Sequence, residues 1–380
     1  MKQIVGWLVY ILVVALSIVF LRGYYSLAFK FLFIFAGMST CAIYEFRDVA
    51  FSSFLKASVY WLGLLLVLSF LSHAKRNSNQ AELSNDTGHP LHIALFLLCV
   101  LAAMYLSGRL SGFRLVLSFD DVATYRREIL TAHFPATIRY LLSLVGGTLL
   151  PYYFGYFLSK RSYTLTCLAL FGGILVFSIN GMKTWLLVYL LIFLVFLSYR
   201  FNGQHVITYI LIFMCIWIPI SIFQYNQTGR FNLLALLGRT IYIPSQIGYD
   251  YIDFFDANEY LYLRESLLRF FFRSPYPFGS SYFIVGGYAT TATTAQANNG
   301  LWGDAYANFG FLGLLIYPGL LGLVIHGYRK AMEGYDERLS VAVLFSLLWT
   351  AISNSLFTWL LTGGVFVVVL ISRVGRKAQQ

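Results

Sequence analysis

Apolar segments long enough to cross a lipid bilayer follow one another almost from end to end of this 380-residue chain. A helix needs about 20 apolar residues to span the hydrocarbon core, with a range of roughly 17–25, and it satisfies its own backbone hydrogen bonds there. Eleven candidate spans are 4–21, 27–44, 54–71, 91–107, 137–158, 163–179, 185–200, 206–223, 310–328, 339–353 and 355–372.

These segments predict an all-α polytopic integral membrane protein with about 10–12 transmembrane helices. We expect 10–12 helices, and not exactly the eleven candidate segments, because the last two segments meet at Ser353-Asn354-Ser355 and form either two spans or one kinked helix. We expect Met1–Leu21 to be an uncleaved first span, since no small-x-small cleavage site precedes Arg22.

The composition supports a membrane protein. Charged residues make up 11% of the chain, against about 25% in soluble domains. The spans leave no room for a separate soluble core, so we expect residues 1–380 to form a single transmembrane domain. The net charge of +11 suits positive cytoplasmic loops and anionic lipid, and no basic run or motif indicates nucleic-acid binding.

Charge asymmetry predicts the orientation of the chain. Arg373, Arg376 and Lys377 follow the last span and favour a cytoplasmic C-terminus. Alternation of the spans then puts residues 224–309 on the outer, periplasmic face. The basic 108–136 loop also falls outside, so it is either an error in this topology or a functional positive patch.

Residues 224–309 form one large polar loop in this otherwise apolar chain. The loop contains ten tyrosines, no lysine and no histidine, and its five arginines are Arg230, Arg239, Arg264, Arg269 and Arg273. Guanidinium groups bind phosphate and pyrophosphate in a bidentate manner, and aromatic rings stack on sugars. The alternative is that the arginines contact lipid headgroups while the tyrosines form an interfacial belt.

We expect the loop to be partly helical. Residues 232–260, which include Tyr242, resemble a surface helix interrupted by Pro244, and residues 261–272 resemble a second helical piece. In the first piece the acidic side chains recur every three residues and share one flank, which suits either a solvated face or a hard cation; they are Asp250, Asp253, Asp256 and Glu259. No metal is expected, because the four cysteines lie in apolar segments without metal-ligand spacing.

Further polar side chains stand at the predicted outer mouths of spans. Lys183 opens one span, Asp304 precedes another, and Asn298-Asn299 lie one or two turns before it. Ionisable groups in such places indicate function, with interfacial snorkelling as the alternative.

Four pieces of the sequence together resemble the Wzy-type O-antigen or oligosaccharide repeat-unit polymerases of bacterial inner membranes. They are SINGMKTWLLVYLLIF (178–193), GRTIYIPSQIGYDYIDFF (238–255), SPYPFGSSYF (274–283) and NNGLWGDAYANFGFLGLLIYPGL (298–320). The resemblance covers about the C-terminal half of the chain, and the N-terminal half is similar to the family in hydropathy.

The resemblance implies a glycosyltransferase of the inner membrane with a periplasmic active face. Such enzymes move a growing glycan from undecaprenyl pyrophosphate to the next lipid-linked repeat unit, without a nucleotide sugar or cofactor, for O-antigen or a related polysaccharide. A chain-length regulator is a possible partner. The resemblance also implies that Arg239 and Lys183 are the best-matched cations for the pyrophosphate.

The chemistry needs positive charge at the leaving pyrophosphate and a group that orients or deprotonates the attacking hydroxyl. Arg239 and Arg264 are the candidates for the first role, and Asp304, or one of Asp250 and Asp253, for the second. Further candidates for substrate binding are Lys183, Arg269, Arg273, Asp250, Asn299 and Tyr242.

Three other classes of membrane protein remain open. An O-antigen ligase would use the same donor, but we expect a key loop histidine there, and this loop has none. A flippase or solute transporter would show polar residues along its mid-membrane helices. A structural subunit would use the loop as an interaction surface.

Overall fold

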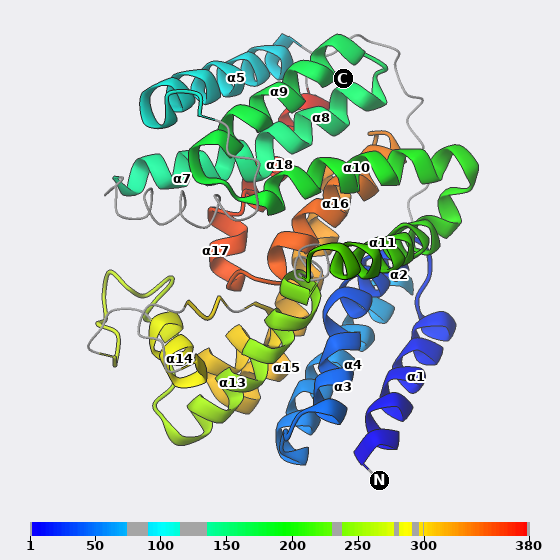
Figure 1. Ribbon diagram of the computed structural model, residues 1–380, viewed down its shortest axis with the longest axis vertical. Coiled ribbons are helices and arrows are strands. Elements are labelled where there is room, and N and C mark those ends of the chain that lie inside the picture. Colours follow the sequence, from blue (N-terminus) through cyan, green and yellow to red (C-terminus); the bar gives the residue numbers. More distant parts are fainter. Residues whose placement is uncertain are drawn as a thin grey trace. The chain divides into compact units, whose positions relative to one another are not determined.

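The computed structural model describes residues 2–73, 90–114, 135–229, 238–276, 281–290, 296–298 and 300–377. All regular secondary structure in these ranges is helical (Figure 1). The helices group into two compact units: residues 1–77, 215–327 and 348–359 in the first, and 78–214, 328–347 and 360–380 in the second. Neither unit is continuous in sequence, because the chain passes between them within helices α11 (Val206–Thr228), α15 (Leu301–Ala331), α16 (Glu337–Ala351) and α17 (Leu356–Leu361).

Eight helices of the described ranges are long and apolar enough to cross a membrane, which confirms a multi-pass membrane architecture. They are Gly23–Phe46, Phe51–His73, Pro90–Ser111, Thr137–Ser159, Thr184–Phe201, Val206–Thr228, Leu301–Ala331 and Leu356–Val374. Two shorter apolar helices, Ile4–Phe20 and Tyr163–Ile179, match two further expected spans. The expected span 339–353 is the 15-residue helix α16, so the full count of 10–12 stays a prediction.

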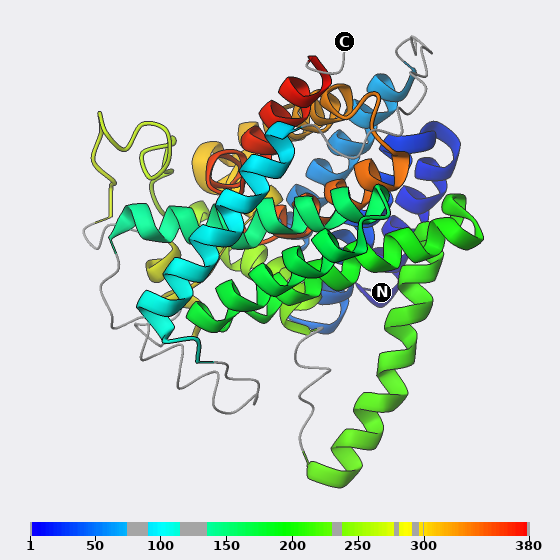
Figure 2. The same ribbon diagram turned by 90° about the horizontal axis from the view of Figure 1, so that it is seen from above.

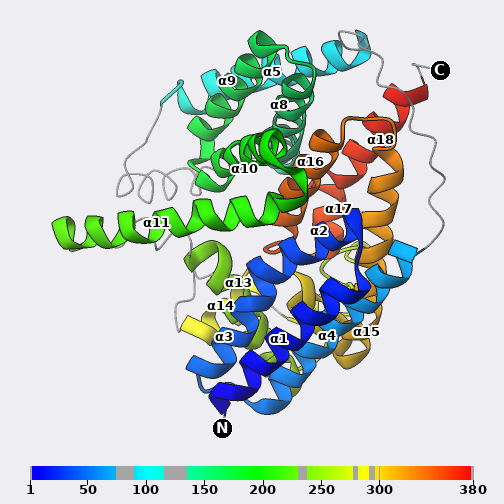
Figure 3. The ribbon, with the colours of Figure 1, turned by 90° about the vertical axis from the view of Figure 1, so that its right-hand side faces the viewer.

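The first unit is built on the N-terminal helices. Helices α1, α3 and α4 run side by side in blue shades, and α2 packs on α4 (Figure 3). A π-helical turn joins α2 to α3 without breaking the span. The bounds are α1 Lys2–Phe20, α2 Gly23–Leu32, η1 Phe33–Gly37, α3 Met38–Phe46 and α4 Phe51–His73.

Part of the large polar loop packs against these helices. The π-helical turn η4 (Gly238–Tyr242) runs into α13 (Ile243–Ala257), which contacts α3, α4 and α14 (Ser281–Thr290). Pro244 lies in the first turn of α13, where a proline without an N–H group is tolerated, so it begins this helix and does not interrupt it. Residues 232–237 of the expected surface helix lie outside the described residues.

The prediction of a second helix in the loop is wrong, because residues 262–271 form successive turns. Tyr262 and Leu263 have φ of 48° and 62°, in the left-handed region. This conformation lets the backbone N–H groups of Leu261 and Tyr262 donate to the carbonyls of Ala307 and Asn308 in α15, at 2.9 and 3.2 Å. Tertiary hydrogen bonds therefore override the helical pattern of the sequence.

The second unit has its core in three helices that lie side by side, α5, α9 and α8 (Figure 1). A π-helical turn joins α7 to α8 within one span, and Gly181, with φ of 62°, ends α9. The bounds are α5 Pro90–Ser111, α7 Ala136–Leu144, η2 Val145–Leu149, α8 Leu150–Ser159, α9 Tyr163–Asn180, α10 Lys183–Phe201, η3 Gly203–His205, and α18 Val365–Lys377; α17 (Leu356–Leu361) contributes to both units.

Candidate functional site

Helix α13 carries polar side chains on one flank and packs its other flank into the first unit. Gln246, Asp250 and Asp253 are spaced by four and three residues, so they share one face of the helix. Ser245 and Tyr251 on the other flank are buried. The Ser245 hydroxyl bonds to the carbonyl of Ala36 in η1 and to the hydroxyl of Ser39 in α3, and the Tyr251 hydroxyl donates to the carbonyl of Ala297 at 3.0 Å. The buried flank therefore fixes the direction in which the polar flank points.

The polar flank of α13 borders a cavity of about 260 Å³ within the first unit. Its opposite wall is the C-terminal end of α3 and the residues that follow it. The lining residues are Ile43, Arg47, Asp48, Val49, Gln246, Tyr249, Asp250 and Asp253. The cavity thus collects three carboxylates, one guanidinium, one amide and one phenol around a space large enough for part of a small polar ligand.

Asp250 has an available carboxylate oxygen. Its Oδ2 atom is buried and has no hydrogen-bond partner in the described part of the chain. Burial raises the pKa of this carboxyl to about 6; the nearby Arg47 opposes the increase and Asp253 adds to it. A buried carboxylate without a partner is costly unless a ligand or proton satisfies it. Asp250 is therefore the side chain in this cavity best suited to accept a proton near neutral pH.

Arg47 is held beside α13 by Gln246. When the Gln246 amide is oriented with its oxygen toward the guanidinium, that oxygen lies 2.8 Å from Nη1 and 3.1 Å from Nη2 of Arg47. Arg47 is otherwise exposed, which leaves the guanidinium able to contact a ligand in the cavity. Asp253 on the next turn accepts a hydrogen bond from Ser53 of α4 at 3.1 Å.

A second polar cluster lies farther along α13. Asp256 accepts from Lys56 of α4 at 2.5 and 2.6 Å and from the hydroxyl of Tyr306 in α15. The Lys56 ammonium also lies 4.9 Å from the centroid of the Tyr306 ring. These contacts join three helices. The expected acidic flank is thus divided: Asp250 and Asp253 face the cavity, Asp256 is paired, and Glu259 lies beyond the end of α13 at Ala257.

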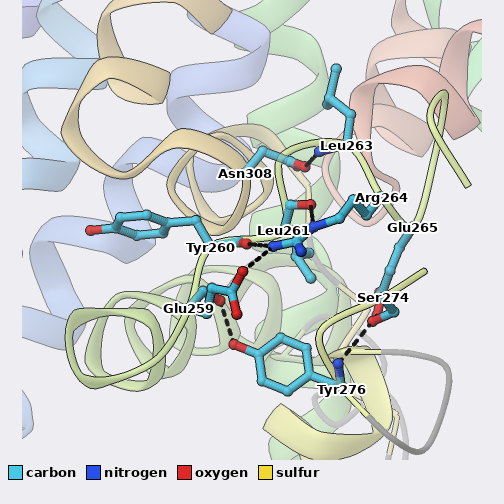
Figure 4. Close-up of polar contacts among 9 residues, drawn as sticks. All are labelled: Glu259, Tyr260, Leu261, Leu263, Arg264, Glu265, Ser274, Tyr276 and Asn308. Carbon is cyan, nitrogen blue, oxygen red and sulfur yellow. Dashed lines mark hydrogen bonds and ion pairs between the residues drawn. The ribbon is translucent and has the colours of Figure 1, made fainter. Parts of the chain in front are cut away.

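Arg264 is engaged by its own loop (Figure 4). Its Nη2 donates to Glu259 Oε1 at 2.6 Å and to the carbonyl of Tyr260 at 2.8 Å, and its Nε donates to the carbonyl of Leu261 at 3.0 Å. These bonds hold the turn that leaves α13. Such a guanidinium stabilises the loop, and only its remaining N–H groups are left for an anion.

Glu265 holds the far side of the same loop. Its carboxylate accepts from the Ser274 hydroxyl and from both the N–H and the hydroxyl of Ser281, all at 2.8 Å. Ser281 is the first residue of α14, so Glu265 caps this helix from a distance. Tyr276, whose hydroxyl donates to the carbonyl of Glu259, closes the loop against α13 (Figure 4).

Asp304 is buried and both of its oxygens are bonded. Oδ2 accepts the backbone N–H of Leu356 at 2.7 Å, and Oδ1 accepts Asn308 Nδ2 at 2.9 Å. Asn308 Oδ1 in turn accepts the N–H of Leu263 at 2.9 Å. Asp304 therefore connects α15 to α17 and, through Asn308, to the loop. It does not line the cavity beside α13.

The remaining predicted residues are dispersed. Tyr242 ends η4 directly before α13, while Arg269 and Arg273 are exposed on the loop. The backbone of Arg239 lies in η4 and that of Lys183 begins α10, in the second unit; both side chains, and Asn299, lie outside the described residues. Of all the predicted residues, the cavity therefore includes Asp250 and Asp253.

Arg47 and Gln246 are the site residues that the sequence prediction missed. Arg47-Asp48 form a short charged break between two apolar spans, which is a weak sequence signal in its own right. In the described residues no group of three or more His, Cys, Asp or Glu side chains could hold a metal ion, despite the carboxylates of the cavity.

Three kinds of comparison with known proteins give no match: no family model fits the chain, and no curated protein or solved structure is significantly similar to it.

Proposed function

We propose that this protein polymerises lipid-linked oligosaccharide repeat units, transferring a growing glycan from undecaprenyl pyrophosphate to a sugar hydroxyl of the next lipid-linked unit. The observation that carries the proposal is the unpartnered, buried carboxylate oxygen of Asp250 in a polar cavity on α13. All but the last two residues of helix α13 lie within Gly238–Phe255, one of the four pieces that resemble Wzy-type polymerases.

The packing around α13 supports a single functional region. Three of the four pieces lie in the first unit, and the second piece contacts both the third and the fourth there. A Cβ atom at Gly248 would meet the Trp302 ring at 2.6 Å, so α13 and α15 approach closely at this glycine. Tyr276 of the third piece packs on Phe254 and Phe255 of α13, with ring centroids 5.7 and 6.0 Å apart.

The composition of the cavity suits a sugar better than a pyrophosphate. Three carboxylates face one guanidinium, so the lining would repel a polyanion. Carboxylate, amide and guanidinium groups together bind the hydroxyls of a carbohydrate well, since they offer both acceptors and donors. We therefore assign the cavity to the acceptor sugar and not to the leaving group.

The reaction then needs one proton acceptor and one cationic site. The acceptor oxygen forms a bond to the anomeric carbon of the donor, the bond from that carbon to the pyrophosphate oxygen breaks, and the pyrophosphate leaves with the electron pair. Asp250 takes the hydroxyl proton. Arg239, in the helical turn that runs directly into α13, is the candidate that stabilises the leaving pyrophosphate, because Arg264 is engaged by its loop.

This proposal includes a bacterial inner-membrane location with the cavity on the periplasmic face, and a chain-length regulator as partner. It involves no cofactor and no nucleic acid. The multi-pass helical architecture supports the membrane location at the coarse level.

Reconstitution tests the proposal directly. The full-length protein in proteoliposomes, supplied with the native lipid-linked repeat unit, should give a ladder of products on a gel. Asp250→Asn should leave the single unit unextended. Glu337→Gln, an isosteric loss of an exposed carboxylate in the second unit, is the matched control and should keep the ladder.

A deletion strain separates the rival functions. A polymerase deletion leaves lipopolysaccharide with a single repeat, a ligase deletion leaves no ligated glycan, and a flippase deletion accumulates repeat units on the inner leaflet. Either of the last two results would overturn the proposed function.

A further inference from the structure

The loop after α13 exposes three consecutive phenylalanines. Phe270, Phe271 and Phe272 have exposed fractions of 79%, 79% and 57%. They lie in a series of turns and not in a membrane-spanning helix, and Figures 1 and 2 show this yellow-green segment extending beyond α13 and α14. Exposed apolar clusters of this kind outside a span mark an interaction surface.

The attachment of the loop indicates its depth. Leu261, Tyr262 and Leu263 donate their N–H groups to the last residues of α15 before its kink at Phe309 and Gly310. The apolar part of α15 begins at this kink, where the sequence predicts that the span 310–328 enters the bilayer. If the bilayer begins at the expected span 310–328, the loop is attached at the level of the membrane surface.

The charges beside the phenylalanines complement lipid phosphates. Arg269 and Arg273 bracket the three rings and are both exposed, and the described residues give neither of them an ion pair. Arg269 lies over the Phe270 ring, with its guanidinium carbon 4.7 Å from the centroid. Arginine next to aromatic side chains is typical of segments that rest in the interface of a bilayer containing anionic lipid.

We propose that residues 267–273 are an interfacial membrane anchor: the phenylalanine rings enter the boundary between headgroups and acyl chains, and Arg269 and Arg273 contact lipid phosphates. The anchor holds the loop that follows α13 against the membrane. Leu267 and Tyr262, which are 45% and 47% exposed, extend the apolar surface of the anchor. The inference does not rest on the proposed function, because an inactive protein would anchor in the same way.

Spin-label accessibility in nanodiscs tests the anchor. The full chain with Cys167→Ala and Cys215→Ala, which leaves the two buried cysteines, receives a nitroxide at Phe271→Cys or, as control, at exposed Ala257→Cys near the end of α13. In nanodiscs with phosphatidylglycerol, the label at 271 should be accessible to oxygen, shielded from a water-soluble nickel chelate, and about 5–10 Å into the interface. The label at 257 should be accessible to the chelate.

Two results would overturn the anchor. Accessibility to the chelate at 271 equal to that at 257 means that the loop stands in water. Shielding at 271 from both reagents means that protein, and not lipid, covers the phenylalanines. Labels at Phe270→Cys and Phe272→Cys repeat the measurement if the Phe271→Cys protein does not fold. Arg269→Gln with Arg273→Gln should make the label at 271 shallower in anionic nanodiscs, and the change should be smaller in phosphatidylcholine, whose phosphate is balanced by its choline group.

Discussion

The carboxylate of Asp304 accepts the backbone N–H of Leu356, 52 residues away, at 2.7 Å. Leu356 is the first residue of α17, so this bond satisfies an N–H group that a helix start leaves without an internal partner. Asp304 also accepts Asn308 Nδ2 at 2.9 Å. The geometry gives Asp304 a structural role, although its position at a span mouth predicted a catalytic one.

Asp304→Ala should destabilise the protein by about 1–3 kcal/mol, because the N–H of Leu356 loses its acceptor and the amide of Asn308 keeps only the backbone carbonyl of residue 304. Asp304→Asn should also destabilise, since its NH₂ group would face one of those two donors. Thermal unfolding followed by size-exclusion chromatography measures the effect. A variant with the wild-type melting temperature and no product ladder would instead restore the catalytic role.

The activity should rise with pH through about 6, because burial raises the pKa of Asp250 to about 6 and the base must be ionised. Initial rates of ladder formation over roughly pH 4 to 8 give the profile. Asp250→Glu should shift this acidic limb and keep part of the activity, while Asp250→Asn should remove the limb with the activity. A limb unchanged in Asp250→Glu would assign the proton to another group.

The raised pKa of Asp250 also predicts that stability changes with pH in the opposite direction to activity. The pKa of Asp250 is higher in the folded protein than its ordinary value of 3.8, so the folded state binds the proton more tightly. The contribution of Asp250 to stability is therefore fully present below about pH 3.8 and is lost as pH rises through about 6. At pH 7 Asp250→Asn should melt at a higher temperature than wild type, and the difference should shrink as the pH falls below 6. A lower melting temperature for Asp250→Asn at pH 7 would contradict the assigned burial.

Substitutions of Arg264 and of Arg239 should differ in their effects on melting temperature and activity. Arg264→Ala loses three hydrogen bonds that hold the loop, so it should lower both the melting temperature and the activity. Arg264→Lys should rescue little, because an ammonium cannot reproduce the guanidinium fork. Arg239→Ala should lower the turnover and leave the melting temperature unchanged. Normal chain-length distributions in both alanine variants would sink the assignment of either arginine to the reaction.

The apolar pattern predicted the architecture because the requirement of a spanning helix is local: enough consecutive apolar residues suffice. Helix α13 was predicted for a similar reason, since its polar side chains recur on one flank. The cavity could not be predicted in this way. Arg47 and Gln246 are far apart in sequence and meet because α13 packs on α3.

The loop shows the other limit of sequence reasoning. Residues 261–272 have the composition of a helix, yet hydrogen bonds to α15 impose turns on them. In the same way, the burial of Asp304 depends on where α17 begins. Both outcomes depend on contacts between segments distant in the chain, which no local pattern records.

The three hydrogen bonds from Leu261, Tyr262 and Leu263 to α15 have a consequence for redesign of the loop. The point at which the loop is attached is set by the position of the acceptor residues along α15, and not by the number of residues in the loop. Insertions among residues 266–273 should therefore be tolerated without moving the attachment. One residue inserted between Asp304 and Asn308 would rotate the acceptors by about 100° around the helix axis and detach the loop from its helix.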